Sequence, residues 1–325
     1  MDSPNDVPAP PTAAGLSWRP LQPVDVGAIA SLAATCLAAD GGLQLGATDA
    51  YLREHYLAAR SGSSIGAFET DGRLVACAAT QPTHTANEYR ATIVGQVHPD
   101  LRRRGFGTFL LRWSIAEAGR LLAACPTDHP QVLQLTTEML TEDAARLFER
   151  HGFSQQFAED VMQRDLAAPL PDVLPPSAIK FATWAPALAD QFFAVYQAAF
   201  RERQRPGYPG WSQEKWMAWL ETDADDFRPE TSLLATHDDI PAGFIVCADR
   251  WIVQMGVRPE QRGRGIGSAL VTEALKRFRA AGGDHVLLDV NVNNPGAARV
   301  YTRLGFERVG RRARYIRGLK GHKGL

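Results

Sequence analysis

The sequence has few of the residues that indicate a disulfide framework, a metal site or a membrane protein. Its four cysteines, Cys36, Cys77, Cys125 and Cys247, lie far apart among 325 residues, without a CxxC pair or histidines at metal-ligand spacing. We expect buried free thiols and no bound metal. No stretch reaches the roughly 18 apolar residues of a membrane span, and the start has no signal-peptide pattern. These features predict a cytoplasmic protein without a membrane partner.

A surplus of charge of either sign is also missing. The sequence has 35 basic and 36 acidic residues, a formal net charge of -1. Proteins that bind the phosphates of nucleic acids usually have more basic than acidic residues. We therefore expect no nucleic-acid partner. Any basic site in this chain has to be local.

The length of the chain predicts two domains, each large enough to bury a core. Residues 1–14 are rich in proline and alanine and predict a disordered tail. Residues 167–177, AAPLPDVLPPS, have four prolines in eleven positions and predict a semi-rigid linker. The predicted domains are therefore 15–166 and 178–325.

The two predicted domains have the same order of elements. Each begins with a strand and helices, continues with a hairpin and a further strand, and then alternates helix and strand to its end. We expect an α/β fold, an α+β mixed sheet with helices on both faces. The strands expected on either side of the main motifs are 89–97 and 132–138 in the first domain, and 251–257 and 285–292 in the second.

A glycine-rich loop occurs once in each domain. VRPEQRGRGIG at 257–267 follows an apolar strand and precedes an apolar-periodic helix, and VHPDLRRRGFG at 97–107 does the same 160 positions earlier. Such a turn can expose consecutive N–H groups at a helix N-terminus, where the helix dipole also favours an anion. Neither loop has the Gly-Lys-Ser/Thr ending of a nucleotide-hydrolysing P-loop. The repeat of one motif at this offset indicates two copies of one domain.

These residues resemble the GNAT superfamily of acetyl-CoA-dependent N-acetyltransferases. Its signature, Arg or Gln, two residues, Gly, one residue, then Gly or Ala, is matched by Arg262, Gly265 and Gly267, and by Arg102, Gly105 and Gly107. A companion pattern in the second domain is matched by Asn294, Ala297, Tyr301, Gly305 and Phe306. The resemblance implies two tandem acyl-CoA N-acyltransferase folds.

The resemblance also implies the coenzyme site. In the second domain it implies that the pyrophosphate binds at Arg262, Gly263, Arg264, Gly265, Ile266, Gly267 and Ser268, and that the pantetheine arm lies along Met255 and Val257, with Asn294 nearby. In the first domain the corresponding residues are Val97, Arg102, Arg103, Arg104, Gly105, Phe106, Gly107 and Thr108. Acetyl-CoA is the expected cosubstrate.

The chemistry implied by the resemblance is direct attack of a primary amine on the thioester. Tyr301 occupies the position of the acid that protonates the leaving sulfur, although it could be only a packed aromatic residue. The first domain has Phe148 there and Thr141 in place of Asn294, so we expect it to be catalytically degenerate. Asp289 is the first candidate for the base and Asp249 the second, while solvated or structural roles stay open for both.

The acceptor is a small-molecule amine whose identity the sequence leaves open. Tyr208, Trp211 and Gln254 are candidate substrate-binding residues, although tryptophans at helical spacing are often core. The tandem arrangement is also similar to the mycothiol synthases, which acetylate a cysteinyl pseudodisaccharide. A non-catalytic acyl-CoA-binding module is the alternative from another class. We expect a monomer or a homodimer.

Overall fold

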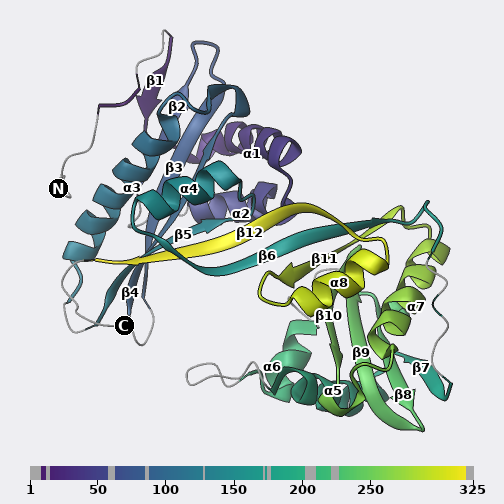
Figure 1. The fold of residues 1–325 in the computed structure, drawn as a ribbon. Helices are drawn as coiled ribbons and strands as arrows, with labels where there is room; N and C mark the ends of the chain where they lie inside the picture. The colour runs from purple at the N-terminus through teal and green to yellow at the C-terminus, as the bar shows by residue number, and fades with distance from the viewer. Residues whose placement is uncertain are drawn as a thin grey trace. The chain divides into compact units, whose positions relative to one another are not determined.

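The protein is described from a computed structural model covering residues 9–11, 15–57, 63–84, 88–126, 129–170, 173, 177–201, 210–220 and 227–319. The chain forms two compact units. Unit 1 comprises Met1–Asp160 and Val309–Leu325, and unit 2 comprises Val161–Arg308. Each unit combines a sheet with helices, as the sequence predicts (Figure 1).

Unit 1 contains the first half of the elements and the last strand of the chain. They are β1 (Ser17–Arg19), α1 (Val26–Asp40), α2 (Asp49–Leu52), a π-helical turn (Arg53–Leu57), β2 (Ser63–Phe68), β3 (Leu74–His84), β4 (Tyr89–Val97), α3 (Phe106–Ala123), β5 (Gln131–Thr137), α4 (Glu142–Arg150), β6 (Ser154–Asp165) and β12 (Glu307–Gly318).

The sheet of unit 1 has the strand order β1-β2-β3-β4-β5-β12-β6. The pairing of β4 with β5 is parallel, and the pairs β1–β2, β2–β3, β3–β4 and β5–β12 are antiparallel. Apolar side chains of α1 and α2 pack on one face of this sheet, and those of α3 pack on the other. The helices thus cover both faces of the mixed sheet (Figure 1).

Unit 2 contains the corresponding elements of the second half. They are β7 (Ile179–Thr183), α5 (Ala189–Phe200), α6 (Gln213–Ala218), β8 (Leu233–His237), β9 (Ile240–Ala248), β10 (Trp251–Val257), α7 (Ile266–Ala280), β11 (His285–Asn291) and α8 (Pro295–Arg303). The strand order is β6-β11-β10-β9-β8-β7, of which β10 and β11 are parallel. An aromatic cluster with α5 and α6 lies on one face, and the apolar residues of α7 and α8 lie on the other.

The two halves of the sequence exchange their last strands, which the sequence did not predict. Residues 313–318 of β12 pair antiparallel with residues 132–137 of β5, although β12 ends the second half of the chain. On its other side, β12 neighbours β6, and Arg312 there forms an ion pair of 2.7 Å with Glu159. The end of β6 continues into unit 2, where the N–H of Leu166 donates to the carbonyl of Asp284 at 2.9 Å. Unit 1 therefore needs the C-terminal strand for its sheet.

Helix α1 is apolar enough to resemble a membrane span, and one side of it packs against the sheet of unit 1. The segment Pro23–Asp40 has the length and hydropathy of a candidate span. Its residues Ile29, Leu32 and Ala33 are buried in a cluster with β3 and β4. The buried residues make up 28% of the segment, so this packing accounts for only part of its apolar composition.

The cysteines are free thiols, and Cys36, Cys77 and Cys247 are buried. Burial raises the pKa of Cys247 to about 12 and also raises the pKa values of Cys36 and Cys77. These three thiols are therefore protonated at neutral pH.

The exchanged strand gives a stability prediction. Tyr315 of β12 is 1% exposed and its ring meets the edge of Phe148 of α4 at 5.3 Å. We expect Tyr315→Ala to lower the free energy of unfolding of unit 1 by about 3 kcal/mol, because it leaves a cavity under α4. Hydrogen exchange should show faster exchange in β5, and no change in β8 and β9 of unit 2.

Tyr315→Phe is the matched control, since it keeps the ring and removes only the hydroxyl, which lies 3.3 Å from Gln155. It should exchange nearly as slowly as the parent protein. Faster exchange confined to unit 2 in Tyr315→Ala would contradict the assignment of β12 to unit 1.

Candidate active site

The central feature of unit 2 is a fork between two parallel strands. The pairing of β10 with β11 includes only Trp251 with Leu287 and Ile252 with Leu288, so residues 253–257 extend beyond the paired region. The register of β10 against β9 shifts between Ile252 and Gln254, which is a β-bulge. Since a bulge bends its strand, it directs the end of β10 away from β11.

The fork directs backbone polar groups of β10 into the gap. The N–H of Arg258 donates to the carbonyl of Ala242, so every second N–H of β10 points toward β9. By this alternation the N–H groups of Met255 and Val257 point away from β9 and toward the fork. These are the two residues whose backbone the family resemblance assigns to the pantetheine arm.

Unit 1 has a similar fork without the bulge. Here β4 pairs with β5 from Tyr89 to Ile93, and β4 continues to Val97 in regular register with β3. The N–H of His98 donates to the carbonyl of Val75, so every second N–H of β4 points toward β3. By this alternation the N–H groups of Gly95 and Val97 point into the gap. Both units therefore present two backbone donors at the same place.

The glycine loops after the two forks have the same backbone conformation. The N-cap residues of α3 and α7, Gly105 and Gly265, have φ of 87° and 79°, a left-handed conformation that favours glycine. Two residues earlier, Arg103 and Gly263 are also left-handed, with φ of 62° and 78°. Each loop thus leads into a helix N-terminus, a geometry that suits a pyrophosphate.

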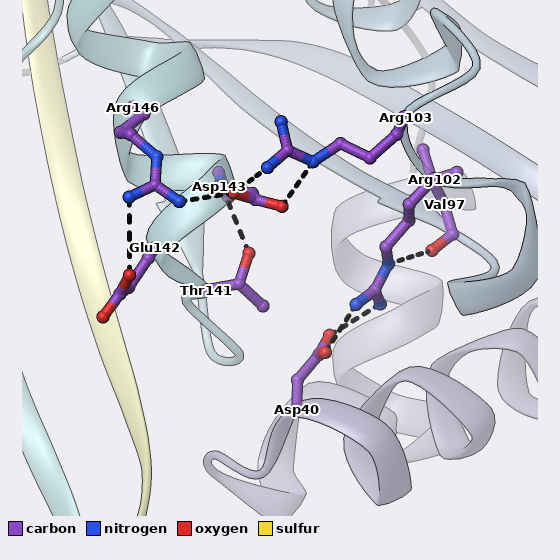
Figure 2. A network of polar contacts seen from close by, with 9 residues as sticks. Asp40, Val97, Arg102, Arg103, Thr141, Glu142, Asp143 and Arg146 are labelled. Carbon is purple, nitrogen blue, oxygen red and sulfur yellow. Dashed lines mark hydrogen bonds and ion pairs between the residues drawn. The ribbon is translucent and has the colours of Figure 1, made fainter.

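The signature arginines are held by different partners in the two units. Arg102 forms a bidentate ion pair with Asp40 of α1 at 2.6 and 2.7 Å, and this hydrogen bonding raises the pKa of the guanidinium (Figure 2). Its Nε also donates to the carbonyl of Val97 at 3.1 Å. In unit 2, Arg262 donates to the carbonyls of Val257 and Ala199. Arg102 thus ties the first loop to α1, which the sequence did not reveal.

A second acidic contact joins the first glycine loop to α4 (Figure 2). Asp143 accepts from Arg103 at 2.7 Å and from Arg146 at 2.6 Å, and these contacts lower the pKa of its carboxyl group, with Arg146 the larger cause. In the alignment that places Thr141 opposite Asn294 and Phe148 opposite Tyr301, Gly296 stands at the position of Asp143. The corresponding loop position in unit 2 is Gly263, so neither partner of this ion pair has a counterpart there.

The helix after each fork begins in the same way, which supports the superposition of the two halves. Thr141 caps α4 by accepting from the N–H of Ala144 at 3.2 Å, and Asn294 caps α8 by accepting from Ala297 at 3.3 Å. Tyr301 of α8 is 7% exposed, and its ring meets the edge of Phe306 at 5.8 Å. Phe148 has the corresponding position on α4.

A cavity of about 410 Å³ passes through the fork of unit 1. On one side of the sheet it is lined by Cys36, Tyr51 and Tyr56 from α1, α2 and the π-helical turn, and on the other by Thr108 and Leu147 from α3 and α4. Because these helices cover opposite faces, the cavity connects the face with the glycine loop to the face with α1. Gly95, the counterpart of Met255 by loop alignment, lies at its wall.

The residues of unit 2 predicted to bind coenzyme or substrate have different surroundings. The side chain of Met255 is close to Gly267 of the loop. Gln254 accepts a hydrogen bond of 2.9 Å from the indole of Trp216. Trp211 packs against Trp219 and Tyr196 in the aromatic cluster, while Tyr208 lies outside the described residues.

The candidate bases lie at opposite ends of the paired region. Asp289 follows Leu288, the last residue of β11 paired with β10, and is therefore at the fork. Leu288 and Val290 face the core beneath α7 and α8, so alternation directs Asp289 to the face of α5 and α6. Asp249 lies in the turn before β10, away from the fork, with Arg228 at 3.7 Å.

Both halves of the chain match known acetyltransferases. Residues 192–306 match the acetyltransferase (GNAT) family, and residues 61–155 match an acetyltransferase (GNAT) domain. A mycothiol acetyltransferase of Thermobispora bispora is 31% identical over 232 residues, which are 65% of this chain and 71% of the relative. The chain belongs to the GNAT family of N-acetyltransferases.

Two similar proteins match the chain along nearly its whole length. A mycothiol acetyltransferase of Parafrankia sp. is 29% identical over 94% of this chain and 99% of its own length. The crystal structure of a GCN5-related N-acetyltransferase from Sphaerobacter thermophilus has a TM-score of 0.70 and 27% identity, and the match covers 96% of this chain and 98% of that one. Two GNAT domains in one mixed α/β chain are therefore shown.

The Asp143 contact yields a prediction about coenzyme affinity in this tandem GNAT enzyme. Asp143→Asn should tighten CoA binding to unit 1 about threefold, because it removes a negative charge beside the loop and loosens Arg103 and Arg146 from their partner. Calorimetric titration of CoA in a Gly265→Asp background, which obstructs the other loop, would measure it.

Glu142→Gln is the matched control, since Glu142 contacts Arg146 at 3.4 Å and is 90% exposed but does not contact Arg103. It should change the CoA affinity by less than Asp143→Asn does. Weaker CoA binding in Asp143→Asn would show that the ion pair supports the site instead of competing with the phosphates.

Proposed function

We propose that this N-acetyltransferase transfers acetyl from acetyl-CoA to the primary amine of a small molecule, with the chemistry in unit 2. The observation that carries this proposal is the bulged fork of β10 and β11, with two backbone donors, a glycine loop at one end and Tyr301 on the adjoining helix. Members of the GNAT family use acetyl-CoA. The donors and the helix N-terminus fit a thioester and a pyrophosphate, respectively.

The residues of unit 2 have separate roles in the proposed reaction. The N–H of Val257 polarises the thioester carbonyl as the acceptor nitrogen bonds to its carbon and the carbon–sulfur bond breaks. Asp289 takes the proton lost by the amine, directly or through a water molecule. Tyr301 donates its phenolic proton to the departing sulfur, since a phenol and a thiol have similar basicity. Solvent then restores the protonation of both side chains.

The identity of the acceptor is proposed from the relatives. Curated relatives named mycothiol acetyltransferase match the chain over as much as 94% of its length, which favours the amine of a cysteinyl pseudodisaccharide as the acceptor. Trp211 and the Trp216–Gln254 contact lie on the face of unit 2 to which Asp289 is directed. The geometry of the site supports the broader class, the primary amine of a small molecule.

Substitutions in unit 2 test where the chemistry occurs. Tyr301→Phe should lower kcat about 100-fold with little change in KM for acetyl-CoA, because the phenol acts on the leaving group. Asp289→Asn should lower kcat by a similar factor. Release of CoA thiol in the presence of a panel of amines, including a cysteinyl pseudodisaccharide, measures both.

Arg102→Ala and Gly105→Asp in unit 1 provide the comparison. Their effect on kcat should be small beside that of Tyr301→Phe. Full turnover in Tyr301→Phe together with lost turnover in the unit 1 variants would place the chemistry in unit 1.

A further inference from the structure

A buried arginine of unit 2, Arg164, lies at the C-terminal end of the helix that carries Tyr301. Arg164 is on β6 and is 6% exposed. Its Nε donates at 3.0 Å to the carbonyl of Leu304, the residue that follows α8. Its other two nitrogens donate to the carbonyls of Asp165 and Pro169 at 2.7 and 2.5 Å. The guanidinium thus connects the end of α8 to the end of β6 and the segment after it.

A cation at this place suits the end of a helix. The last carbonyls of an α-helix have no partner within the helix, and the helix dipole places partial negative charge there. Arg164 supplies both a donor and a positive charge to this end of α8. A Cβ at position 305 would lie only 2.8 Å from the Nε of Arg164, and φ is 82° there. The close approach therefore depends on Gly305.

The turn that Arg164 contacts also fixes the backbone and ring of Tyr301. The carbonyl of Tyr301 accepts from the N–H groups of Leu304 and Phe306, both at 3.0 Å. The ring of Tyr301 meets the edge of Phe306. Met162, two residues before Arg164 on β6, is buried in the same apolar cluster as Tyr301. A displacement of this turn would therefore displace the phenol.

Unit 1 contains the same contact at the end of its own last helix. In the alignment of the two halves, Arg317 of β12 stands opposite Arg164. Arg317 donates at 2.8 Å to the carbonyl of His151, which follows α4 and stands opposite Leu304. The helix end in unit 1 follows Phe148 instead of a tyrosine. Each exchanged strand thus brings an arginine to a helix of the other half, and only one of these helices carries a phenol at this position.

We propose that Arg164 is a positioning residue for Tyr301 in acetyl transfer. Its hydrogen bond to the end of α8 holds the turn that fixes the phenol, so that the hydroxyl meets the departing sulfur. Arg164 takes no part in the proton transfer itself, and the proton still passes from Tyr301 to the sulfur. The inference rests on the proposed function, and it gives the last strand of the first half a role in the chemistry of unit 2.

Substitution of Arg164 in the full chain should affect kcat more than KM. Arg164→Met keeps a long side chain and removes every donor. It should lower kcat for thiol release about tenfold and change KM for acetyl-CoA less than about twofold, because it displaces the phenol and leaves the coenzyme loop intact. Arg164→Lys keeps the charge but not the planar set of donors, so kcat should fall about threefold.

Arg317→Met is the matched control, because it removes the equivalent hydrogen bond at the end of α4 in unit 1. The chemistry is proposed for unit 2, and the helix end that Arg317 contacts carries no phenol. The kcat of Arg317→Met should therefore stay within about twofold of the parent value.

A double variant separates positioning from a general loss of stability. If Arg164 acts through the phenol, Arg164→Met should lower kcat less than about twofold in a Tyr301→Phe background. A general loosening of unit 2 would lower kcat by the same factor in both backgrounds. The comparison therefore reports the coupling between the two side chains.

A tyrosine label reports the surroundings of Tyr301 without turnover. In the full chain with 13Cζ-tyrosine, the Tyr301 signal is the one lost in Tyr301→Phe. It should shift in Arg164→Met and in Arg164→Lys, and it should keep its parent position in Arg317→Met. The signal of Tyr196, which lies in the aromatic cluster of unit 2, shows whether each variant keeps the parent fold. Arg164→Lys provides the test if Arg164→Met does not fold.

Three results would overturn the inference. They are an unchanged Tyr301 signal in folded Arg164 variants, an equal loss of kcat from Arg164→Met in both backgrounds, and an equal loss of kcat in Arg317→Met. A failure of the proposed function is different, since it would appear as missing thiol release with every amine in the parent protein. The tyrosine signals would still test the contact in that case.

Discussion

The edge of the fourth strand in each unit has backbone N–H groups with no strand beside them. Met255 and Val257 in unit 2, and Gly95 and Val97 in unit 1, direct these donors into a fork by the alternation of antiparallel pairing. Backbone donors removed from water need a partner, so such a gap favours a ligand that lies along the strand. The glycine loop at the end of the same strand adds a helix N-terminus for an anion.

The two units have the same arrangement of strands, loop and helix but different residues around the fork. Unit 1 has Gly95 at its fork, a cavity through its sheet and carboxylates that hold the loop arginines. Unit 2 has Met255 beside the loop, a bulge that separates its strands, and Tyr301 on the following helix. Duplication has thus given the two units one arrangement of strands, loop and helix with different side-chain contacts.

Much of this could be predicted from the sequence because it depends on local patterns. The loops at 97–107 and 257–267 and the strands before them follow from glycine positions and apolar runs, and the mixed α/β fold follows from the order of elements. The family resemblance identified Tyr301 and Phe148 as counterparts, and the helix N-caps Thr141 and Asn294 now support that pairing.

The remaining features depend on residues that are distant in the sequence. The pairing of β12 with β5 joins segments about 180 residues apart, and nothing in either strand specifies its partner. Asp40 and Glu138 are single acidic residues at the ends of ordinary elements, and only the fold brings them to Arg102 and to the cavity. The bulge in β10 likewise has no marker such as glycine or proline at residue 253.

A crystal structure of the full chain with acetyl-CoA tests the central claim most directly. The account predicts the thioester in the fork of β10 and β11, its carbonyl oxygen about 3 Å from the N–H of Val257 and its sulfur facing Tyr301. An acetyl thioester found only in the fork of unit 1, with none in the fork of unit 2, would contradict it.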